Sequence, residues 1–222
     1  MSTEYGKIDT LYERDKATFK VQPGIFKNRT YSLLKTWRWT EKVDGTNVRV
    51  SYFPGCVNAT AEDVMVNGAG PTVTVGGRTD NAQMPADLVQ SILAQVTIEK
   101  MASVFQSSVV LYGEGYGGSI QKGSGYSPTK KFILFDVLID GTWWMNQEQI
   151  QDIAGKLGLD VVPVVGDWSM EEATDFVRGG FHTLLPGAAP DKMAEGLVGR
   201  PLETMYDSRH HRLITKLKTK DF

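Results

Sequence analysis

The segment Trp39–Val50, with the sequence WTEKVDGTNVRV, constrains the fold of this chain more than any other stretch. Aromatic and β-branched residues on both sides of Asp44-Gly45 favour two strands, at about Trp37–Val43 and Asn47–Phe53. Asp-Gly is a frequent pair in tight turns between strands, so the sequence predicts a hairpin with Lys42 beside its bend. Lys42 is then either an ordinary solvated lysine or a nucleophile, and its partners elsewhere in the chain must decide between the two.

The 222 residues are enough for one sizeable hydrophobic core, and we expect a single domain over residues 1–222 with no separate C-terminal domain. The hydrophobic content of 41% and charged content of 23% are typical of a soluble globular protein. No window approaches the roughly eighteen consecutive apolar residues of a membrane span, and no signal peptide begins the chain, so no membrane partner is expected. One cysteine, Cys56, excludes a disulfide framework, and a reducing, cytoplasmic location is expected.

Basic residues are concentrated in two segments of a chain whose net charge is only −2. Residues 14–38 hold seven Lys or Arg against one acid, and residues 200–222 hold six against three. The low net charge argues against a general nucleic-acid coat. The two segments would form a groove that follows phosphates if the fold brings them together, and otherwise they are solvated faces.

Local patterns predict the remaining elements. A short helix is expected at Ile8–Asp15, and proline followed by helical apolar spacing predicts another at Pro85–Val96. Two capping boxes, Asn146–Gln149 and Ser169–Glu172, should begin two more helices. We expect strands at Val109–Gly115, Lys131–Leu138, Leu159–Val165 and His211–Lys218, a hairpin excursion over Pro54–Gly77, and a mobile loop at Gly179–Pro190. Strand alternation would put Lys216 and Lys218 on the same face of the last strand.

Gly113–Gly118 matches the G-x-G-x-x-G pattern after a strand. A dinucleotide site requires these glycines to open a helix. Ser119–Pro128 contains two glycines and ends in proline, so it cannot be that helix. No Walker A sequence is present, and the kinase motifs that would accompany a glycine loop are missing.

A lysine nucleophile needs specific neighbours, because it must lose its proton near neutral pH. Two nearby ammonium groups and a divalent cation would lower its pKa, and cations would also stabilise a phosphate under attack. Carboxylates can hold a hydrated Mg²⁺ or accept ribose hydroxyl groups, and an aromatic face suits adenine. Candidates stand at or near the ends of predicted strands: Glu114, Phe135, Asp136, Glu195, Lys216 and Lys218.

The order of these residues resembles the six motifs of the covalent nucleotidyltransferases, the superfamily of ATP-dependent DNA ligases, RNA ligases and mRNA capping enzymes. The matching segments are Glu41–Asn47, Gly77–Thr79, Tyr112–Glu114, Phe132–Asp136, Glu195–Arg200 and Lys216–Lys218. Within this superfamily the chain is most similar to the nick-sealing branch of RNA ligases. This similarity is carried by Glu-Lys-x-Asp-Gly-Thr-Asn, by Gly-Arg-Thr and by Gln121-Lys-Gly123. The resemblance implies an α+β, ATP-grasp-like ligase domain, with mainly antiparallel sheets flanked by helices around a nucleotide pocket.

The resemblance also implies roles for individual residues. Lys42 would attack the α-phosphate of ATP and form lysyl-AMP, with Lys216 and Lys218 neutralising that phosphate. Asp44 and Glu195 would orient waters on Mg²⁺ or Mn²⁺, whereas Asp136 would support the site without touching the ligand. The remaining contacts would come from the backbone at Glu41 (adenine amino group), Asn47 (α-phosphate or RNA 5′-phosphate), Arg78 and Glu114 (ribose), and Phe135 and Val198 (the two adenine faces).

The implied partner is RNA with 5′-phosphate and 3′-hydroxyl ends, as a nicked duplex or a single strand, and a monomer is expected. Two features depart from the family pattern. Gly199 stands where the fifth motif usually has an apolar strand former, so we expect a looser strand. The chain ends four residues after Lys218, whereas related ligases add a further domain, so it is either a minimal ligase or the adenylyltransferase part of one. A DNA ligase, a capping-type guanylyltransferase and an RNA-binding module without turnover remain alternatives.

Overall fold

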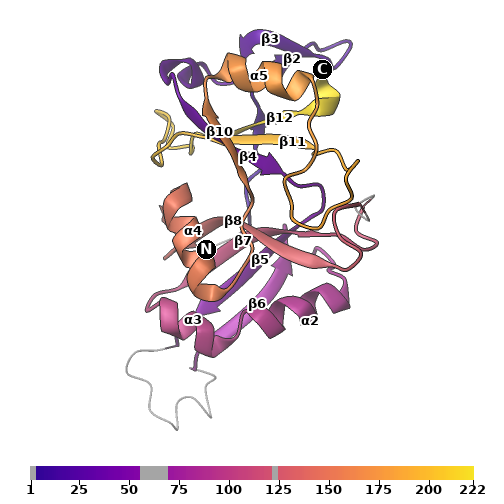
Figure 1. Cartoon of the computed structure of the whole chain (residues 1–222). Helices are drawn as coiled ribbons and strands as arrows, with labels where there is room; N and C mark the ends of the chain where they lie inside the picture. Colours follow the sequence, from indigo (N-terminus) through magenta and orange to yellow (C-terminus); the bar gives the residue numbers. More distant parts are fainter. Residues whose placement is uncertain (1–3, 56–69, 122–124) are drawn as a thin grey trace. The chain divides into compact units, whose positions relative to one another are not determined.

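The contacts of the chain divide it into two compact units (Figure 1). The computed structural model describes residues 4–55, 70–121 and 125–222. Unit 1 comprises Met1–Tyr5, Gly45–Ser124 and Pro128–Val161, and unit 2 comprises Gly6–Asp44, Gly125–Ser127 and Val162–Phe222. Three features of the sequence analysis lie outside the described residues. They are Cys56, most of the predicted hairpin excursion at Pro54–Gly77, and Lys122 and Gly123 of the Gln121-Lys-Gly123 segment. The single-domain assignment stays a prediction.

Unit 1 is built on a five-stranded sheet in the order β6-β5-β7-β8-β9, in which all neighbouring strands are antiparallel. Its strands are β5 (Thr46–Phe53), β6 (Thr72–Gly77), β7 (Val109–Tyr116), β8 (Lys131–Ile139) and β9 (Trp143–Trp144). Its helices are α2 (Ala86–Gln95), α3 (Ile98–Val104) and α4 (Gln147–Leu157).

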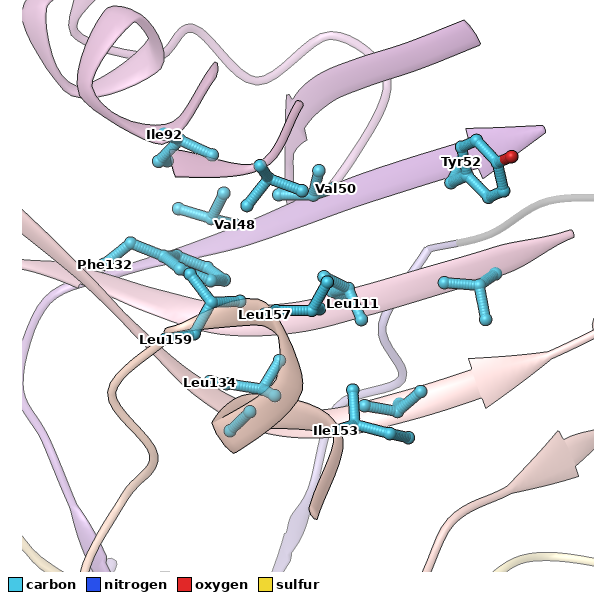
Figure 2. Close-up of a cluster of buried hydrophobic side chains, with 14 of the residues drawn as sticks. Val48, Val50, Tyr52, Ile92, Leu111, Phe132, Leu134, Ile153, Leu157 and Leu159 are labelled. Atoms are coloured by element: carbon cyan, nitrogen blue, oxygen red, sulfur yellow. The ribbon is translucent and has the colours of Figure 1, made fainter. Parts of the chain in front are cut away.

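One face of this sheet forms the core of unit 1 (Figure 2). On β5, Val48 and Val50 are fully buried and alternate with Asn47 and Arg49, because successive strand side chains point to opposite faces. The apolar face packs against side chains of all three helices, among them Leu88, Ile92, Met101, Ile153 and Leu157. Each such aliphatic side chain contributes about 1.5–3 kcal/mol on burial. The opposite face of the sheet therefore carries the polar residues of β5.

Unit 2 contains a second five-stranded sheet, in the order β1-β12-β11-β4-β10, and a separate β2-β3 pair. All neighbours in it are antiparallel except β1 and β12. The strands are β1 (Asp9–Thr10), β2 (Tyr12–Arg14), β3 (Val21–Phe26), β4 (Trp37–Lys42), β10 (Val164–Trp168), β11 (Gly196–Arg200) and β12 (Thr215–Lys218). The helical elements are η1 (Arg29–Leu33), α5 (Met170–Arg178) and η3 (Thr219–Asp221).

The core of unit 2 lies between α5 and one face of this sheet (Figure 1). Trp37 and Trp39 on β4 are fully buried, and Leu197 of β11 and Leu217 of β12 lie on the same face. The helix contributes Met170, Ala173 and Val177 to this cluster. Among the helices that the structure describes, none has the length and apolarity needed to cross a membrane.

Several local predictions are confirmed. Asn146 and Ser169 each form a complete capping box, and they begin α4 and α5. The predicted helix after Pro85 is α2, and β7 and β8 lie within a residue or so of their predicted bounds. These signals depend on hydrogen bonds and periodicities within a single segment, so the sequence carries them locally.

Other predictions are wrong, because pairing partners distant in sequence determine the local structure. Ile8–Asp15 is not helical, since Asp9–Thr10 pairs with β12 and Tyr12–Arg14 pairs with β3. The hairpin at Asp44-Gly45 does not form either. Strand β4 pairs with β10 and β11, β5 pairs with β6 and β7, and the chain passes from unit 2 to unit 1 at this turn. The strand expected at Leu159–Val165 instead begins at Val164.

Gly199 does not interrupt its strand. It pairs with Trp39 of β4 on one side and with Thr215 of β12 on the other. A Cβ atom at this position would lie 2.5 Å from the indole ring of Trp39. The glycine therefore accommodates the large buried ring, and the expected loosening of the strand is wrong.

We predict that Gly199→Ala lowers the free energy of unfolding by about 1–3 kcal/mol, because the added methyl group overpacks against Trp39. The control is Gly155→Ala in α4, where a Cβ atom would meet nothing within 4 Å. That change should stabilise the chain by up to about 1 kcal/mol, because alanine favours helix over glycine. Urea unfolding measures both. Equal stability of wild type and Gly199→Ala would contradict the packing argument.

Candidate functional site

Strand pairing places three predicted lysines on one face of the sheet in unit 2. Gly196 on β11 is opposite Lys42 on β4 and also opposite Lys218 on β12, so these residues form one row across three strands. In the next row, Val198 is opposite Lys216. This face is the reverse of the one that carries Trp39 and Leu217 into the core. The predicted alternation of Lys216 and Lys218 on one face is confirmed, in a strand shorter than expected.

The Glu195 carboxylate joins two of these lysines. Its Oε2 atom pairs with Nζ of Lys42 and its Oε1 atom pairs with Nζ of Lys218. Burial acts to raise the pKa of Glu195, but the charges and hydrogen bonds of the two lysines outweigh it and hold that pKa below its ordinary value. Glu195 is therefore ionised at neutral pH and serves as the counter-ion of the pair.

Lys216 completes a cluster with an excess of positive charge. Burial, as the largest cause, and the charges of Lys218, Lys42 and Lys7 together lower the pKa of Lys216 to about 8. The charge of the Glu195 carboxylate acts in the opposite direction and raises that pKa. Three lysines around one carboxylate suit an anionic ligand, because an added phosphate would relieve the repulsion between the ammonium groups.

Gly196 makes the row of lysines possible. Its φ of +151° is rarely adopted by residues with a side chain, and a Cβ atom there would overlap the carbonyl oxygen of Leu217. Glycine thus lets β12 lie close enough to β11 for Lys218 to reach Glu195. The residue before this glycine supplies the carboxylate and the paired strands supply the amines.

Glu41 and Asp44 flank the nucleophile but have different environments. The Glu41 carboxylate accepts hydrogen bonds from the Thr183 hydroxyl and from the backbone N–H of Leu184, the latter at 2.7 Å. Burial raises the pKa of Glu41. Asp44 is half-buried, and its backbone N–H donates to the Tyr126 hydroxyl at 3.4 Å. The Glu41 side chain is thus hydrogen-bonded within the protein, and its backbone N–H donates to the carbonyl oxygen of Pro163 at 2.9 Å. The contact of the Glu41 backbone with the adenine amino group stays a prediction.

The predicted metal role rests on Asp44 and Glu195. Across the part of the chain that the structure describes, no three His, Cys, Asp or Glu side chains group as a metal site. Mg²⁺ commonly keeps several waters and is held by one or two carboxylates together with substrate phosphates. Asp44 and Glu195 would supply the two carboxylates of that mode, and both oxygens of Glu195 are paired with lysines in this structure. The assignment of Asp44 and Glu195 stays a prediction.

The predicted ribose and phosphate contacts of unit 1 lie at one end of its sheet. Asn47 is directly opposite Glu114 in the β5–β7 register, and Arg78 follows Gly77, which pairs with Val48. The Oδ1 atom of Asn47 is buried and has no hydrogen-bond partner within residues 4–55, 70–121 and 125–222. A buried polar atom of this kind normally has a partner, and a hydroxyl donor of a ligand would supply one.

Phe135 and Asp136 are adjacent on β8 and differ in burial. Phe135 is half-buried and meets the ring of Tyr5 edge-on, with 5.2 Å between the ring centroids. Asp136 is fully buried and accepts a hydrogen bond from the Tyr5 hydroxyl at 2.7 Å. The geometry of Asp136 fits the supporting role expected for it. Stacking of Phe135 on adenine stays a prediction.

Four residues near the predicted ones were missed by the sequence reasoning: Tyr5, Arg49, Tyr126 and Thr183. For Arg49 a signal existed, since it shares the strand face of Asn47 and follows it by two residues. Arg49 pairs with Asp80, two residues after Arg78, and it passes over Gly76, where a Cβ atom would lie 3.1 Å from its Nε atom. Thr183 had no local signal, because its partner Glu41 is 142 residues away.

The two basic segments meet within unit 2. Arg14 forms an ion pair with Asp221 at 2.7 Å, and the Tyr31 hydroxyl donates to the carbonyl oxygen of Ile214 at 3.0 Å. Contact between the segments, on which the phosphate-groove hypothesis depends, is therefore present. The groove itself stays a prediction.

Comparisons with known structures identify the fold. The Naegleria gruberi RNA ligase with PPi has a TM-score of 0.59 and 18% identity, over 84% of this chain and 50% of that chain. A lysine-to-alanine variant of the same ligase with ATP and Mn has a TM-score of 0.61 and 17% identity, over 96% of this chain and 62% of that chain. A glutamate-to-alanine variant of that ligase with AMP and Mn has a TM-score of 0.62 and 16% identity, over 96% of this chain and 61% of that chain. The predicted α+β nucleotidyltransferase fold is confirmed, and the chain spans about half to three-fifths of the length of these ligases.

A sequence-family comparison is more specific. The family model described as RNA ligase matches residues 35–218, which is most of the chain. The chain belongs to the RNA ligase family, as the order of its motifs predicted. No curated protein matches it.

The pKa of Lys216 predicts a pH dependence of stability. In the folded state this pKa is about 8, below the ordinary lysine value of 10.5. The unfolded chain therefore binds this proton more tightly, and the contribution of Lys216 to stability rises with pH between these two values. Lys216→Met should raise the free energy of unfolding at pH 7 by about 1 kcal/mol after allowance for solvent screening, and the gain should shrink toward pH 10.

Urea unfolding of wild type and Lys216→Met from pH 7 to pH 10 measures this difference. Lys220→Met is the control, because Lys220 is exposed on the turn after β12. A Lys216→Met variant that is less stable than wild type at pH 7 would show that the lysine stabilises the cluster instead of straining it.

Proposed function

We propose that this chain is an ATP-dependent RNA ligase, or the adenylyltransferase part of one, in which Lys42 forms a lysyl-AMP intermediate. The neutral Lys42 amine attacks the α-phosphate of ATP. A nitrogen–phosphorus bond forms, the bond from that phosphorus to the bridging oxygen breaks, and pyrophosphate leaves. The observation that carries the proposal is the position of Lys42, in one row with Lys218 and joined to it through Glu195, within a chain of the RNA ligase family.

The charges of the lysine cluster support this chemistry. Negative charge builds on the α-phosphate oxygens during attack, and Lys216 and Lys218, which share a sheet face with Lys42, would neutralise it. A divalent cation, Mg²⁺ or Mn²⁺, would supply further positive charge, with Asp44 and Glu195 holding its waters. Solved structures of the Naegleria gruberi ligase contain ATP or AMP with Mn.

Residues of unit 1 would bind the nucleoside and orient it. We assign Arg78 and Glu114 to the ribose hydroxyls and Asn47 to the α-phosphate or the RNA 5′-phosphate. The amide N–H group of Asn47 would donate to such a phosphate, whereas its buried Oδ1 atom, which has no hydrogen-bond partner among the described residues, would accept from a ligand hydroxyl. For adenine, we assign Phe135 and Val198 to the two ring faces and the backbone at Glu41 to the amino group.

The second half of the reaction gives the RNA specificity. AMP passes from Lys42 to an RNA 5′-phosphate, and a 3′-hydroxyl then displaces AMP to form the phosphodiester bond. Membership of the RNA ligase family supports RNA as acceptor, with a nicked duplex or a single strand as the form of the substrate. The chain is proposed to act as a monomer.

Labelling with ATP tests the nucleophile. Incubation of wild type with ATP labelled at the α-phosphate and Mg²⁺ or Mn²⁺ should give an acid-labile covalent adduct. Lys42→Ala and Lys42→Arg should reduce the adduct at least about a thousandfold, because neither side chain offers an amine that can lose its proton near neutral pH. Full labelling of either variant would contradict the assignment. Labelling by GTP in place of ATP would identify a capping-type guanylyltransferase.

A panel of 5′-phosphorylated acceptors tests the second half of the reaction. The adenylylated chain should transfer AMP to an RNA 5′-phosphate and seal a nick with RNA on the 3′-hydroxyl side faster than an all-DNA nick. Equal sealing of both nicks would favour a DNA ligase. RNA binding by a chain that forms no adduct would favour a binding module without turnover, although binding alone gives no reason for a lysine at position 42.

A further inference from the structure

The segment Phe181–Ala194, called here the 181–194 loop, is tied at both ends. The backbone N–H of Thr183 donates to the carbonyl oxygen of Lys192 at 2.9 Å, and that of Ala194 donates to Phe181 at 3.0 Å. Its residues form no named strand or helix, as expected for the loop at Gly179–Pro190, and the mobility expected of that loop stays a prediction. These hydrogen bonds give the loop a defined path that leads directly to Glu195.

The first attachment of this loop is to the residue before the nucleophile. Glu41 is 1% exposed, and its carboxylate accepts from the Thr183 hydroxyl and from the N–H of Leu184. The Thr183 hydroxyl oxygen also accepts from the N–H of Leu185 at 3.2 Å. A buried carboxylate depends on such donors, because burial without them costs several kcal/mol, on the order of the desolvation penalty of the group.

The second attachment leads to the residue two positions after the nucleophile. The N–H of Ala189 donates to the carbonyl oxygen of Gly125 at 2.8 Å, and Nζ of Lys192 lies 4.2 Å from the centroid of the Tyr126 ring. Tyr126 is 1% exposed, and its hydroxyl accepts from the N–H of Asp44. The loop therefore fixes Tyr126, and Tyr126 contacts the turn that follows Lys42.

These contacts matter because Lys42 is the last residue of β4. The sheet hydrogen bonds hold the backbone up to this point, whereas Val43 and Asp44 leave the sheet. We propose that the 181–194 loop positions the nucleophile, with Thr183 and Tyr126 as positioning residues that act through Glu41 and Asp44. The inference rests on the proposed role of Lys42, and it adds two residues that do not themselves touch ATP.

Thr183→Val and Thr183→Ser form a matched pair. Valine has the shape of threonine without its hydroxyl, and serine keeps the hydroxyl. Relative to wild type, the rate constant of adduct formation at saturating ATP should fall about tenfold for Thr183→Val and less than about threefold for Thr183→Ser. Small misplacements of a nucleophile slow its attack strongly. The ATP concentration for half-maximal rate should change less than about twofold in both, because no nucleotide contact is removed.

Tyr126→Phe tests the second attachment, because it removes the hydroxyl and keeps the ring beneath Lys192. Adduct formation should slow about fivefold, and the backbone N–H of Asp44 should exchange with solvent several-fold faster, an effect that needs no activity to be observed. Tyr206→Phe is the control, since Tyr206 is 45% exposed in unit 2, and neither measurement should change. Thermal unfolding of every variant establishes that folded chains are compared.

The outcomes separate the two proposals. A wild-type chain that forms no adduct would contradict the proposed function, and the exchange of the Asp44 amide would still decide whether Tyr126 restrains the turn. An active wild type with unchanged rates in Thr183→Val and Tyr126→Phe would contradict the role of the loop alone. A raised ATP requirement at an unchanged maximal rate would also overturn it, because that result indicates a binding role.

Discussion

The ion pairs of Glu195 with Lys42 and Lys218 are the interaction on which the site in unit 2 depends. Three ammonium groups on one sheet face repel one another, and half-buried charges are costly without a counter-ion. One carboxylate shared by two lysines reduces this repulsion but leaves the cluster with a net positive charge. The pKa of Lys216 is accordingly only about 8. A site in this state favours an incoming anion. The electrostatics that limit the stability of the fold are therefore those that would attract a nucleotide.

Both units use the same physical solution to place their polar residues. Each has a five-stranded sheet with one face covered by helices, and strand alternation then puts every second residue on the other face. On β5, Val48 lies in the core and Asn47 lies on the opposite, polar face. On β4, Trp39 anchors the core and Lys42 lies on the reverse face. Core packing thus fixes the orientation of the functional side chains, since a slip of one residue would exchange the two faces.

How much of this was predictable depends on the range of the interaction. The capping boxes at Asn146 and Ser169 and the alternation of Lys216 and Lys218 are local, and the sequence predicts them correctly. Ile8–Asp15 has the composition of a helix, but pairing with β12 overrides a weak local preference. The Asp44-Gly45 turn has the composition of a hairpin, yet each flanking strand has better partners elsewhere. Motif order identified the family because it records many long-range constraints at once, which a propensity cannot do.

The glycines of β11 show why a residue that weakens a strand in isolation can be required in context. Gly199 leaves room for the Trp39 ring, and Gly196 leaves room for the backbone of β12. Trp39 is part of the core that holds β4 in register, and β12 carries Lys216 and Lys218. A larger residue at either glycine would therefore move a strand and, with it, the lysines on the reverse face. The spacing of the charged cluster is thus determined by two positions that carry no charge and no side chain.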